Sequence, residues 1–419
     1  MKKNILLAAT PLLIICFLMP VLGTLQNSTN ILTYGAIKYP SFKIGIYTGS
    51  WNFDEYTAEQ IAATYDMSQS WYHEGWAYDY SAKANQVHAL NPNYKFLVYR
   101  NVGDVFHSWT DEFNLALNSG WLLKDTSGNY LTSYAGENYM VDITNRDYQL
   151  WVAQKIKLWL DQYPIFDGVM ADNALKHGVA EWLGSDRWSQ VYKPETTRPF
   201  TDQEVLDGNA GLLNAIIDAI GTSKILAPNG IWTGFVWADS TAGANYRYVL
   251  SKVPRLNGVL SEGTFLPDAW FTETQWKQSV DMVAWIQDNI LRGHPESRFN
   301  GGTSRADPSE QVMKYGFCSM MLAVKYSEQN TIYFGDLSGS PNLMSLAQIL
   351  RGVDLGSPLG NYYNTGSVYT RDFQDGKVLV NPTDVSYTVT LDGSYTAFDG
   401  SIVSGSLTLN SHTGAILFK

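Results

Sequence analysis

The chain has 419 residues, of which 45% are hydrophobic and 16% are charged, a composition typical of a globular protein rather than a disordered or polytopic membrane protein. Its formal net charge of −11 and its pI near 5.0 argue against nucleic acid or an anionic membrane surface as a partner. Tryptophan and tyrosine are numerous, with 14 and 26 copies, and both residue types provide the flat faces on which sugar rings stack.

The N-terminus has the pattern of an export signal. Two lysines precede an apolar run over 5–22, and Gly23 is a small residue suited to a cleavage site. The sequence therefore predicts a signal peptide over 1–23, a linker over 24–40, and a secreted or cell-surface protein. The apolar run is also about long enough to span a bilayer, so an uncleaved anchor is the alternative. Only in that case would the membrane be a partner.

Cysteine and histidine usage argues against several kinds of chemistry. Cys16 lies in the leader and Cys318 in an apolar stretch, so the mature chain has no internal disulfide and Cys318 is predicted to be a buried thiol. The six histidines are scattered and show no metal-ligand spacing. The sequence contains neither a phosphate-binding loop nor a nucleophile elbow. We therefore predict no metal and no other cofactor.

Between residues 42 and 337, short apolar runs alternate with amphipathic stretches. The runs are candidate strands, over 42–48, 61–67, 95–101, 166–173, 224–230, 257–263, 298–304 and 331–337. Eight strands separated by helices in ~300 residues fit a (β/α)8 barrel better than an open doubly wound sheet. No GxGxxG motif follows the first run, which removes the main nucleotide-binding alternative. We therefore predict an α/β fold with a TIM barrel over 41–365.

Three of the intervening stretches have apolar residues at helical spacing. This spacing places the apolar residues on one face, which would pack against the sheet. The three are the stretch from Tyr148 to Trp159, with Asp142 and Thr144 as candidate caps, the stretch 212–220, and the stretch from Ser309 to Val324.

The pattern changes near Tyr369, where alternating apolar and polar residues replace the helical spacing. DG, NP and SG turns separate four runs of period two, over 378–380, 387–391, 407–409 and 415–418. This pattern predicts a small antiparallel β-sandwich over 366–419. At ~50 residues this domain is short for an independent fold, so we expect it to pack on the barrel.

The active site of a (β/α)8 barrel lies at the carboxyl ends of its strands, so the polar residues that end each run are candidates. Asp172 ends the fourth run and Glu262 the sixth, and both follow apolar residues. Two carboxylates among amides and aromatic rings are what glycoside hydrolysis requires. Taken singly, Asp172 could be a helix cap and Glu262 a solvated loop residue. Asp167, at the other end of the fourth run, is interpreted as structural.

Other polar and aromatic residues near the same edge are candidates for binding substrate. Several have a structural interpretation as well, since Asp66 could be a cap, Asp336 a turn residue, and Arg100 the partner of an acid. The aromatic side chains, including those of Trp232 and Trp237 after the fifth run, could pack on one another instead of on a sugar. The candidate substrate-binding residues are Asp66, Trp71, Trp76, Arg100, Asn101, Asn173, Asn229, Trp232, Asn300 and Asp336.

The segment over 140–173, MVDITNRDYQLWVAQKIKLWLDQYPIFDGVMADN, resembles the hypothetical glycosyl hydrolase families of TIM barrels, with the endo-α-1,4-polygalactosaminidases as more distant relatives. In those families an Asp followed by a helix, and then a strand like FDGVFLDN, forms a recognisable core. Asp142 matches the first Asp, and the residues that match the strand are Asp167, Gly168, Asp172 and Asn173. The tail of the chain also resembles the small β-domain that closes such proteins.

Related barrels with an Asp at the end of the fourth strand often use it as the nucleophile on α-linked sugars, and take the acid from the fifth or sixth strand. The resemblance thus implies Asp172 as nucleophile and Glu262 as acid/base, because the fifth run has no carboxylate. The predicted function is a secreted glycoside hydrolase that acts on an α-linked polysaccharide or oligosaccharide with retention. A non-catalytic glycan-binding or cell-surface protein on the same scaffold is the alternative.

Overall fold

The computed structural model describes residues 44–48, 55–71, 81–133, 136–184, 191–193, 198–266, 269–291, 299–304, 308–325 and 330–419. Contacts divide the chain into the unit Met1–Ala36 and the unit Ile37–Lys419, and all of the described residues lie in the second. The predicted leader and linker therefore lie outside the described residues. Within the described ranges, no helix combines the length and the apolar character that crossing a membrane requires.

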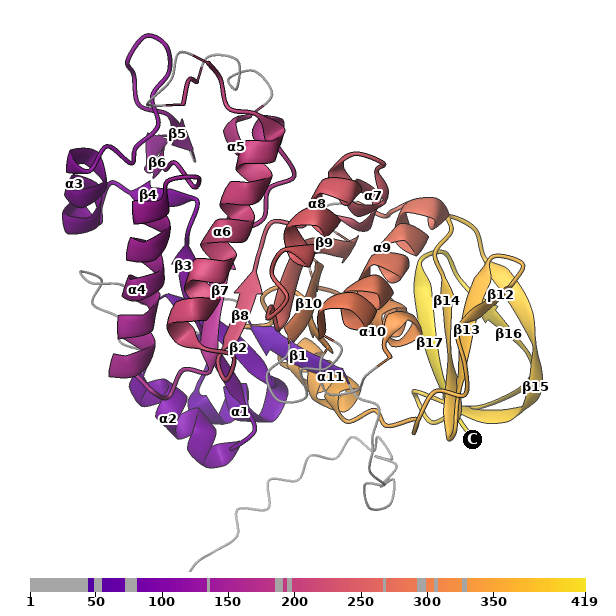
Figure 1. The fold of residues 1–419 in the computed structure, drawn as a ribbon. Coiled ribbons are helices and arrows are strands. Elements are labelled where there is room, and N and C mark those ends of the chain that lie inside the picture. Colours follow the sequence, from indigo (N-terminus) through magenta and orange to yellow (C-terminus); the bar gives the residue numbers. More distant parts are fainter. Residues whose placement is uncertain are drawn as a thin grey trace, which may run out of the picture. The chain divides into compact units, whose positions relative to one another are not determined.

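Eight parallel strands form the main sheet. They are β1 (Gly45–Thr48), β2 (Met67–Trp71), β3 (Lys95–Asn101), β7 (Gly168–Asp172), β8 (Ile225–Pro228), β9 (Gly258–Leu266), β10 (Phe299–Ser304) and β11 (Asn330–Tyr333). Their order in the sheet is β8-β7-β3-β2-β1-β11-β10-β9, and each neighbouring pair is parallel (Figure 1). The prediction of a parallel α/β arrangement is confirmed for the described residues, and seven of the eight predicted runs contain a strand of this sheet.

The sheet curls so that its two end strands approach each other. Ala227 of β8 and Leu260 of β9 share one buried cluster with side chains of β1, β2, β3 and β7. A Cβ built on Gly258 of β9 would lie 2.7 Å from the carbonyl oxygen of Leu226 in β8. Beyond β8, the chain forms a parallel bridge to β9. The inner face of the sheet therefore encloses a small apolar core.

Alternation along β3 divides its side chains between this inner core and the core beneath the helices. Leu97 and Tyr99 belong to the inner cluster, whereas Phe96 and Val98 belong to the large cluster shared with the helices. Successive side chains of a strand point to opposite faces, so the same division extends to the carboxyl end of β3. Position 100 therefore faces the helices.

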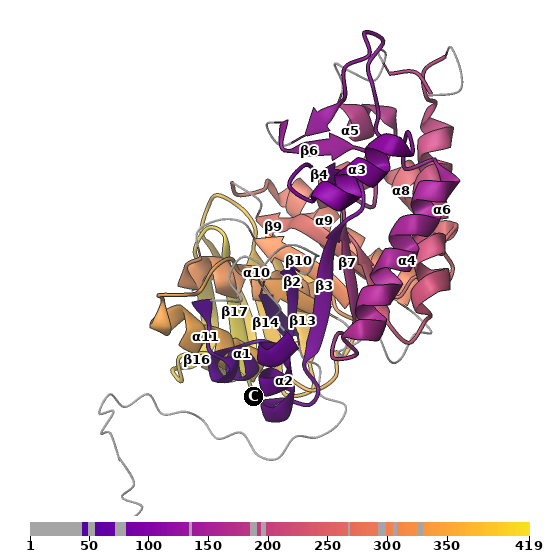
Figure 2. The same cartoon turned by 90° about the vertical axis from the view of Figure 1, so that its left-hand side faces the viewer.

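Helices flank the strands of the main sheet, and α4 and α6 lie side by side (Figures 1 and 2). The three helices expected from apolar spacing are confirmed as α4, α6 and α10. The helices are α1 (Ala58–Thr64), α2 (Ser81–Leu90), α3 (Thr110–Asn118), α4 (Arg146–Gln162), α5 (Val179–Leu183), α6 (Asp202–Ile220), α7 (Gly234–Ala238), α8 (Ala242–Ser251), α9 (Glu273–Ile286), α10 (Glu310–Ala323), α11 (Pro341–Arg351) and the π-helix η4 (Gln287–Leu291).

The prediction of a strand over 61–67 is wrong. Most of that run belongs to α1, and β2 begins only at Met67. The reason is a capping box, in which the Thr57 side chain accepts from the Gln60 main chain and the Gln60 side chain accepts from Thr57. Of the apolar residues of the run, Ile61 and Ala62 are buried on this helix rather than on a strand.

The predicted caps of α4 are also wrong. Asn145 is the N-cap, and its side chain accepts hydrogen bonds from the main-chain N–H groups of Asp147 and Tyr148. Asp142 instead closes the preceding turn, where its Oδ1 accepts from the main chain and the hydroxyl of Thr144 at 2.9 and 2.7 Å.

A small antiparallel sheet, which the sequence did not predict, is inserted between β3 and α4. Its order is β4-β6-β5, from β4 (Asp104–Phe106), β5 (Thr132–Ser133) and β6 (Asn138–Met140). Figure 2 shows it beyond the end of β3, next to α3. Strands of two or three residues are too short to give a periodic signal.

The C-terminal region forms a six-stranded antiparallel sheet of order β12-β13-β14-β17-β15-β16. Its strands are β12 (Tyr363–Thr365), β13 (Val368–Phe373), β14 (Gly376–Asn381), β15 (Tyr387–Ala397), β16 (Ile402–Leu409) and β17 (Thr413–Phe418). The prediction of antiparallel strands at this end is confirmed, although β12 begins ahead of the boundary expected at residue 366. Val378 and Ile416 join the large core under the helices, whereas Leu379 and Leu417 belong to a separate cluster within the sheet.

This C-terminal sheet packs closely on α10. Cys318 of α10 is fully buried, as predicted, and burial raises the pKa of its thiol. A Cβ added to Gly414 of β17 would lie only 2.6 Å from the Cβ of Cys318. The buried Arg371 of β13 donates to the carbonyl oxygens of Met321 and Leu322 at 3.0 and 3.1 Å, at the carboxyl end of α10. The sheet therefore shares a core with the helix layer.

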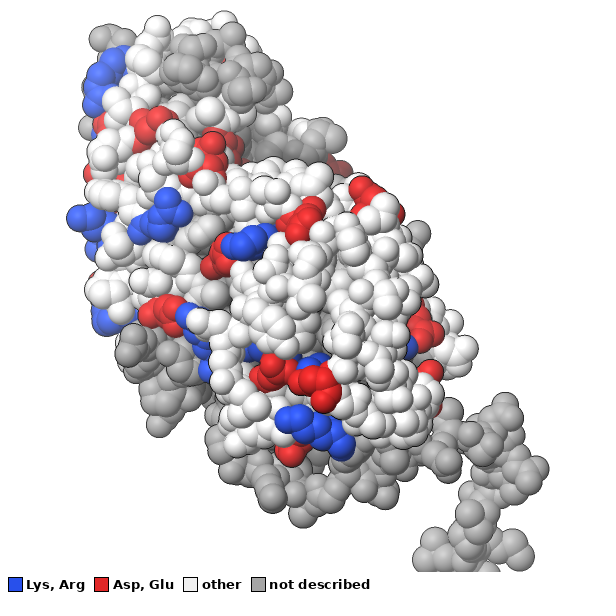
Figure 3. Space-filling model, turned by 90° about the vertical axis from the view of Figure 1, so that its right-hand side faces the viewer, with Lys and Arg blue, Asp and Glu red and all other residues white. Residues whose placement is uncertain are grey.

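Figure 3 shows the molecule from the side on which the C-terminal sheet lies. Acidic and basic side chains are few and interspersed on this face, and large areas carry no charge. The net charge of −11 is therefore not gathered into one patch on this side of the molecule.

Candidate active site

The structure brings Asp172, at the carboxyl end of β7, together with Glu262, which lies in the middle of β9 because that strand continues to Leu266. Asp172 is the last residue of β7 and lies two positions after Met170, which belongs to the inner cluster. Glu262 lies two positions after Leu260, which belongs to the same cluster. Residues two apart on a strand share a face, so both carboxyl groups lie on the inner side of the sheet.

Asn229 connects the two carboxyl groups. It follows β8 directly and is 3% exposed. Its Nδ2 donates to Oδ1 of Asp172 at 2.8 Å and to Oε1 of Glu262 at 2.5 Å. These two oxygens are therefore no more than 5.3 Å apart, the two bond lengths laid end to end. Asn229 was predicted to bind substrate. In the structure its amide nitrogen instead donates to the carboxyl groups of the two catalytic candidates.

The main chain of Asn229 is held between β7 and the loop that follows it. Its N–H donates to the carbonyl of Ala171 at 2.8 Å, and its carbonyl accepts from Ala174 and Leu175, each at 3.0 Å. Its side-chain Oδ1 accepts from the main-chain N–H of Gly230 at 2.9 Å. With both the main chain and the side-chain oxygen fixed, the Nδ2 group points at the two carboxyl groups.

Tyr99 is a site residue that the sequence analysis missed. Its hydroxyl donates to Oδ2 of Asp172 at 2.6 Å, while the main-chain N–H of Asn173 donates to Oδ1 at 2.9 Å. Together with Asn229, these groups give Asp172 three donors, an arrangement suited to a carboxylate. The sequence offered only alternation as a signal, since Tyr99 lies two positions before the candidate Asn101 and therefore on the same face of β3.

Asn173 has a left-handed backbone conformation, with φ of 54°. This conformation is uncommon outside glycine but is tolerated by asparagine. Its Oδ1 accepts from Lys176 Nζ at 3.2 Å, so a cation lies beside the acidic pair. Its Nδ2 is buried and has no hydrogen-bond partner among the described residues.

Asp104 is a third acid near the pair. It is 5% exposed and accepts from the hydroxyl of Ser133 at 3.0 Å. Burial raises the pKa of Asp104, the positive charge of Lys176 lowers it, and the charge of Asp172 raises it. Asn101, a predicted substrate-binding residue, is buried within the turn that leads to Asp104, and its Oδ1 accepts from the main chain there at 3.1 Å.

The structure corrects the prediction that Arg100 binds substrate. Its side chain is fully buried on the helix-facing side of β3, with Nη1 2.8 Å from Oε2 of Glu112. The guanidinium also lies 4.8 Å from the ring centre of Trp109 and 5.4 Å from that of Trp159. The structural interpretation, in which Arg100 pairs with an acid, is therefore the correct one.

Asp66 lies away from the pair, at the amino end of β2. Its Oδ1 accepts from Nε of Arg351 at 2.8 Å and its Oδ2 from the main chain of Ile46 at 3.1 Å. Asp66 was selected as a site residue because a strand was wrongly predicted over 61–67. That strand would have placed Asp66 at its carboxyl end. Asp167 also lies at the amino end of its strand, where it accepts from Lys95 Nζ at 3.0 Å.

Asp336 follows β11 and is exposed. Its Oδ1 accepts from the hydroxyl of Tyr56 at 2.9 Å and from the main chain of Ser338 at 2.7 Å. These contacts match the interpretation of Asp336 as a turn residue, and none of them involves Asp172 or Glu262.

Among the candidate aromatic residues, Trp232 has its main chain next to that of Glu262. Its carbonyl accepts from the main chain of Gly263 at 2.6 Å, next to Glu262, and its side chain is 38% exposed. Trp237 is only 5% exposed and packs against Trp285, which excludes it as a sugar platform. The side chains of Trp71 and Asn300, and the whole of Trp76, lie outside the described residues.

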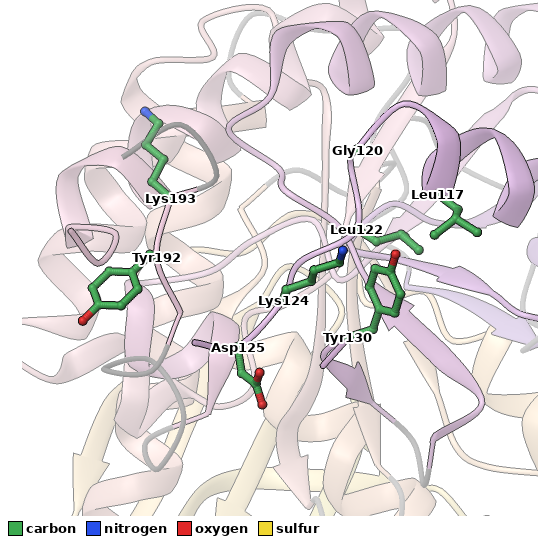
Figure 4. Close-up of a pocket in the computed structure, with 8 residues that line it drawn as sticks. All are labelled: Leu117, Gly120, Leu122, Lys124, Asp125, Tyr130, Tyr192 and Lys193. Atoms are coloured by element: carbon green, nitrogen blue, oxygen red, sulfur yellow. The ribbon is translucent and has the colours of Figure 1, made fainter. Parts of the chain in front are cut away.

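A separate pocket of about 330 Å³ opens near the small sheet (Figure 4). It is lined by Leu117, Gly120, Leu122, Lys124, Asp125, Tyr130, Tyr192 and Lys193. The Lys124 ammonium lies 4.6 Å from the centre of the Tyr130 ring, and the Asp125 carboxylate accepts from the main chain of its own turn. Figure 4 shows Tyr192 and Lys193 extending away from Lys124 and Tyr130. The pocket therefore does not contain the acidic pair.

The described residues include no group of three or more His, Cys, Asp or Glu side chains that could hold a metal ion. The acidic pair is instead surrounded by amide and hydroxyl donors and by one lysine. Such a site can carry out nucleophilic and acid–base chemistry through the carboxyl groups themselves.

Two carboxyl groups held close together on the inner side of a curled parallel sheet suit glycoside hydrolysis, and comparison with known families supports this class. The model of hypothetical glycosyl hydrolase family 15 matches residues 88–377, a range that contains Asp172, Asn229 and Glu262. The chain belongs to hypothetical glycosyl hydrolase family 15. No curated protein matches this chain in sequence.

Solved structures with a similar fold include a GH36 α-galactosidase from Geobacillus stearothermophilus, at a TM-score of 0.51 and 10% identity over 90% of this chain and 55% of that chain. A debranching enzyme from Nostoc punctiforme has a TM-score of 0.46 and 13% identity over 86% of this chain and 87% of that chain. The chain thus spans about half of the α-galactosidase. At such low identity the likeness concerns the fold alone.

Proposed function

We propose that this chain is a secreted glycoside hydrolase that cleaves an α-linked polysaccharide or oligosaccharide with retention. Asp172 is the nucleophile and Glu262 the acid/base. The observation that carries the proposal is the shared Asn229 amide, which keeps the facing oxygens within 5.3 Å of each other. Retaining enzymes separate their carboxyl groups by about 5–5.5 Å and inverting enzymes by about 6.5–9.5 Å, and two carboxyl groups that share one amide nitrogen support the shorter separation.

In the proposed reaction, Asp172 attacks the anomeric carbon while the leaving oxygen takes a proton from Glu262. The glycosidic bond breaks and a covalent glycosyl–Asp172 ester forms. Glu262, now ionised, removes a proton from water, and that water attacks the anomeric carbon and releases Asp172. The Tyr99 hydroxyl and the Asn229 amide fix the orientation of Asp172 for the attack.

We also propose that the curled sheet is the barrel of a (β/α)8 fold over 41–365 and that the C-terminal sheet is a sandwich over 366–419. The bridge between Ile231 and Ser261 supports closure between β8 and β9. The sandwich is supported by the cluster in which Val389 of β15 packs with residues of β13, β14, β16 and β17. A barrel would place the acidic pair in an enclosed, concave site.

The substrate is proposed to contact Trp232 and Asn173. The Trp232 ring is partly exposed next to the strand that carries Glu262, where it can stack on a sugar face. Asn173 offers a donor that the described residues leave unused, directly after the nucleophile. Export is proposed from the leader pattern of two lysines followed by an apolar run.

The test is product analysis over a panel of α- and β-linked glycans, including amino-sugar polymers. We expect the wild type to release products whose first-formed anomer retains the configuration of the substrate, as NMR would show. Asp172→Asn should lower turnover by more than about 1,000-fold, because it removes the nucleophile. Asp167→Asn is the matched control, since Asp167 lies at the opposite end of the same strand and should leave turnover unchanged.

Unchanged hydrolysis by Asp172→Asn would refute the assignment of the nucleophile. Inverted products would refute retention while leaving the hydrolase class intact. Glycan binding without products from any member of the panel, unaffected by Asp172→Asn, would favour the glycan-binding alternative.

A further inference from the structure

We infer that Tyr246 is a positioning residue that holds the Asn229 amide between the two carboxyl groups by way of the main chain of Gly230. The inference rests on the proposed function of that site. Tyr246 lies in α8 and is fully buried, and its hydroxyl donates to the carbonyl of Gly230 at 2.9 Å. Among the described residues its hydroxyl bonds Gly230 and Glu181, so its action on the acidic pair is indirect.

The main chain of Gly230 connects Tyr246 to the Asn229 side chain. The N–H of Gly230 donates to Oδ1 of Asn229, and the carbonyl on the other side of its Cα accepts from Tyr246. Its φ of 142° is open to glycine, and an added Cβ would lie 2.1 Å from the carbonyl oxygen of Leu175. The main chain at Gly230 is therefore held at its N–H, at its Cα and at its carbonyl, and a change at Tyr246 reaches the amide.

The other contacts of Tyr246 lead to the loop after β7. Its hydroxyl lies 2.8 Å from Oε1 of Glu181, and Oε2 of the same carboxylate lies 2.7 Å from Nδ1 of His177. The carbonyl of His177 accepts from Nδ2 of Asn245, the neighbour of Tyr246 in α8, at 2.8 Å. One hydroxyl thus ties Glu181 of α5, in the segment that follows β7, to the loop that carries Asn229.

The hydroxyl can act as a donor throughout the working pH range. Burial, followed by the negative charge of Glu181, raises the pKa of Tyr246 well above its usual value. Its single proton serves either the Gly230 carbonyl or the Glu181 carboxylate, which lie at similar distances. Without this hydroxyl, the peptide after Gly230 loses its partner and the Asn229 side chain can rotate away from one carboxyl group.

The first arm of the test compares Tyr246→Phe with Tyr248→Phe on a glycan that the wild type cleaves. Tyr248 is the matched control, since it lies on the same helix but bonds Asp207 at 2.7 Å and Gln203 at 2.9 Å. We expect Tyr246→Phe to lower kcat by about 10- to 100-fold with little change in KM, as for a small misplacement of reacting groups. Tyr248→Phe should keep the kcat of the wild type.

The second arm asks whether Tyr246 acts through Asn229. If it does, the double variant Tyr246→Phe/Asn229→Ala will be no slower than Asn229→Ala alone, because both changes remove one effect. Additive losses would overturn the inference, as would a Tyr246→Phe enzyme with wild-type kcat.

The third arm needs no substrate. A crystal structure of Tyr246→Phe should show Asn229 Nδ2 displaced from hydrogen-bond distance of Asp172 or Glu262, and two unchanged contacts would overturn the inference. This arm separates the two proposals. An active Asp172→Asn enzyme would refute the proposed function, whereas the position of the amide in Tyr246→Phe decides the positioning role independently.

Discussion

His177 illustrates how single residues near the site respond to pH. The hydrogen bond to Glu181, 2.7 Å from Nδ1, raises the pKa of His177 above its ordinary value of 6.5, with the charges of Glu181, Asp202 and Asp239 adding to the rise and burial opposing it. The folded state therefore binds a proton more tightly than the unfolded chain. The resulting stabilisation is fully present below pH 6.5 and is lost as the pH rises through the higher folded value.

We predict that the free energy of unfolding falls as the pH is raised above neutrality, and that His177→Gln reduces this dependence. Urea denaturation at about pH 6 and about pH 8.5 would measure it. An NMR titration of the imidazole gives the pKa directly, and a value at or below 6.5 would contradict the prediction.

Also at the residue scale, the sequence predicts which carboxylates pair but not what holds them. Asp172 and Glu262 could be selected because each ends an apolar run, and strand ends meet at one edge of a parallel sheet. The bridging role of Asn229 depends on the path of the chain after β8 and on a side-chain rotamer, neither of which leaves a pattern in the sequence. Tyr99 was hidden for a different reason, since a tyrosine within an apolar run also fits a core position.

At the scale of elements, successive side chains of β3 point to opposite faces of the sheet. Tyr99 faces the acidic pair, whereas Arg100 faces the helices. The Arg100–Glu112 ion pair lies on the helix side, and the two side chains are 0% and 8% exposed. Removing one partner of a buried pair leaves the other charge without compensation, which costs about 3–5 kcal/mol.

We therefore predict that Glu112→Gln destabilises the protein by about 3–5 kcal/mol. Asp161→Asn is the control, because the Lys157–Asp161 pair of α4 is largely exposed and should contribute under about 1 kcal/mol. Equal losses from the two variants in chemical denaturation would show that the buried pair is not a major contributor.

The elements themselves were predictable where periodicity was strong. The longest helices and the run over 95–101 match the structure because their apolar spacing extends over several turns or residues. The run over 61–67 failed because a capping box at Thr57 favours a helix, and a short apolar run fits either kind of element. The three-stranded sheet was invisible because its strands are too short for any period.

At the scale of the whole molecule, the C-terminal sheet and the helix layer share one core through α10. Gly414 allows β17 to approach Cys318 so closely that a methyl group would not fit. Overpacking of such a contact typically costs about 1–3 kcal/mol.

We predict that Gly414→Ala destabilises the protein by about 1–3 kcal/mol and increases the reactivity of Cys318 toward a thiol reagent, because β17 must move off α10. Gly393→Ala is the control in the same sheet, since its added Cβ would meet Tyr395 at an ordinary 3.6 Å. If both variants melt at the same temperature, β17 is not confined by α10.

The Asn229 amide has one more consequence, which concerns the placement of a proton. An amide nitrogen only donates, so the Glu262 oxygen that it faces, Oε1, has to accept. When Glu262 is the acid, this bond favours its transferable hydrogen on Oε2, because a carbonyl oxygen accepts more strongly than a hydroxyl oxygen. The departing sugar oxygen is then best protonated from the Oε2 side, so the side chain that follows β8 favours one direction for protonation of the leaving group.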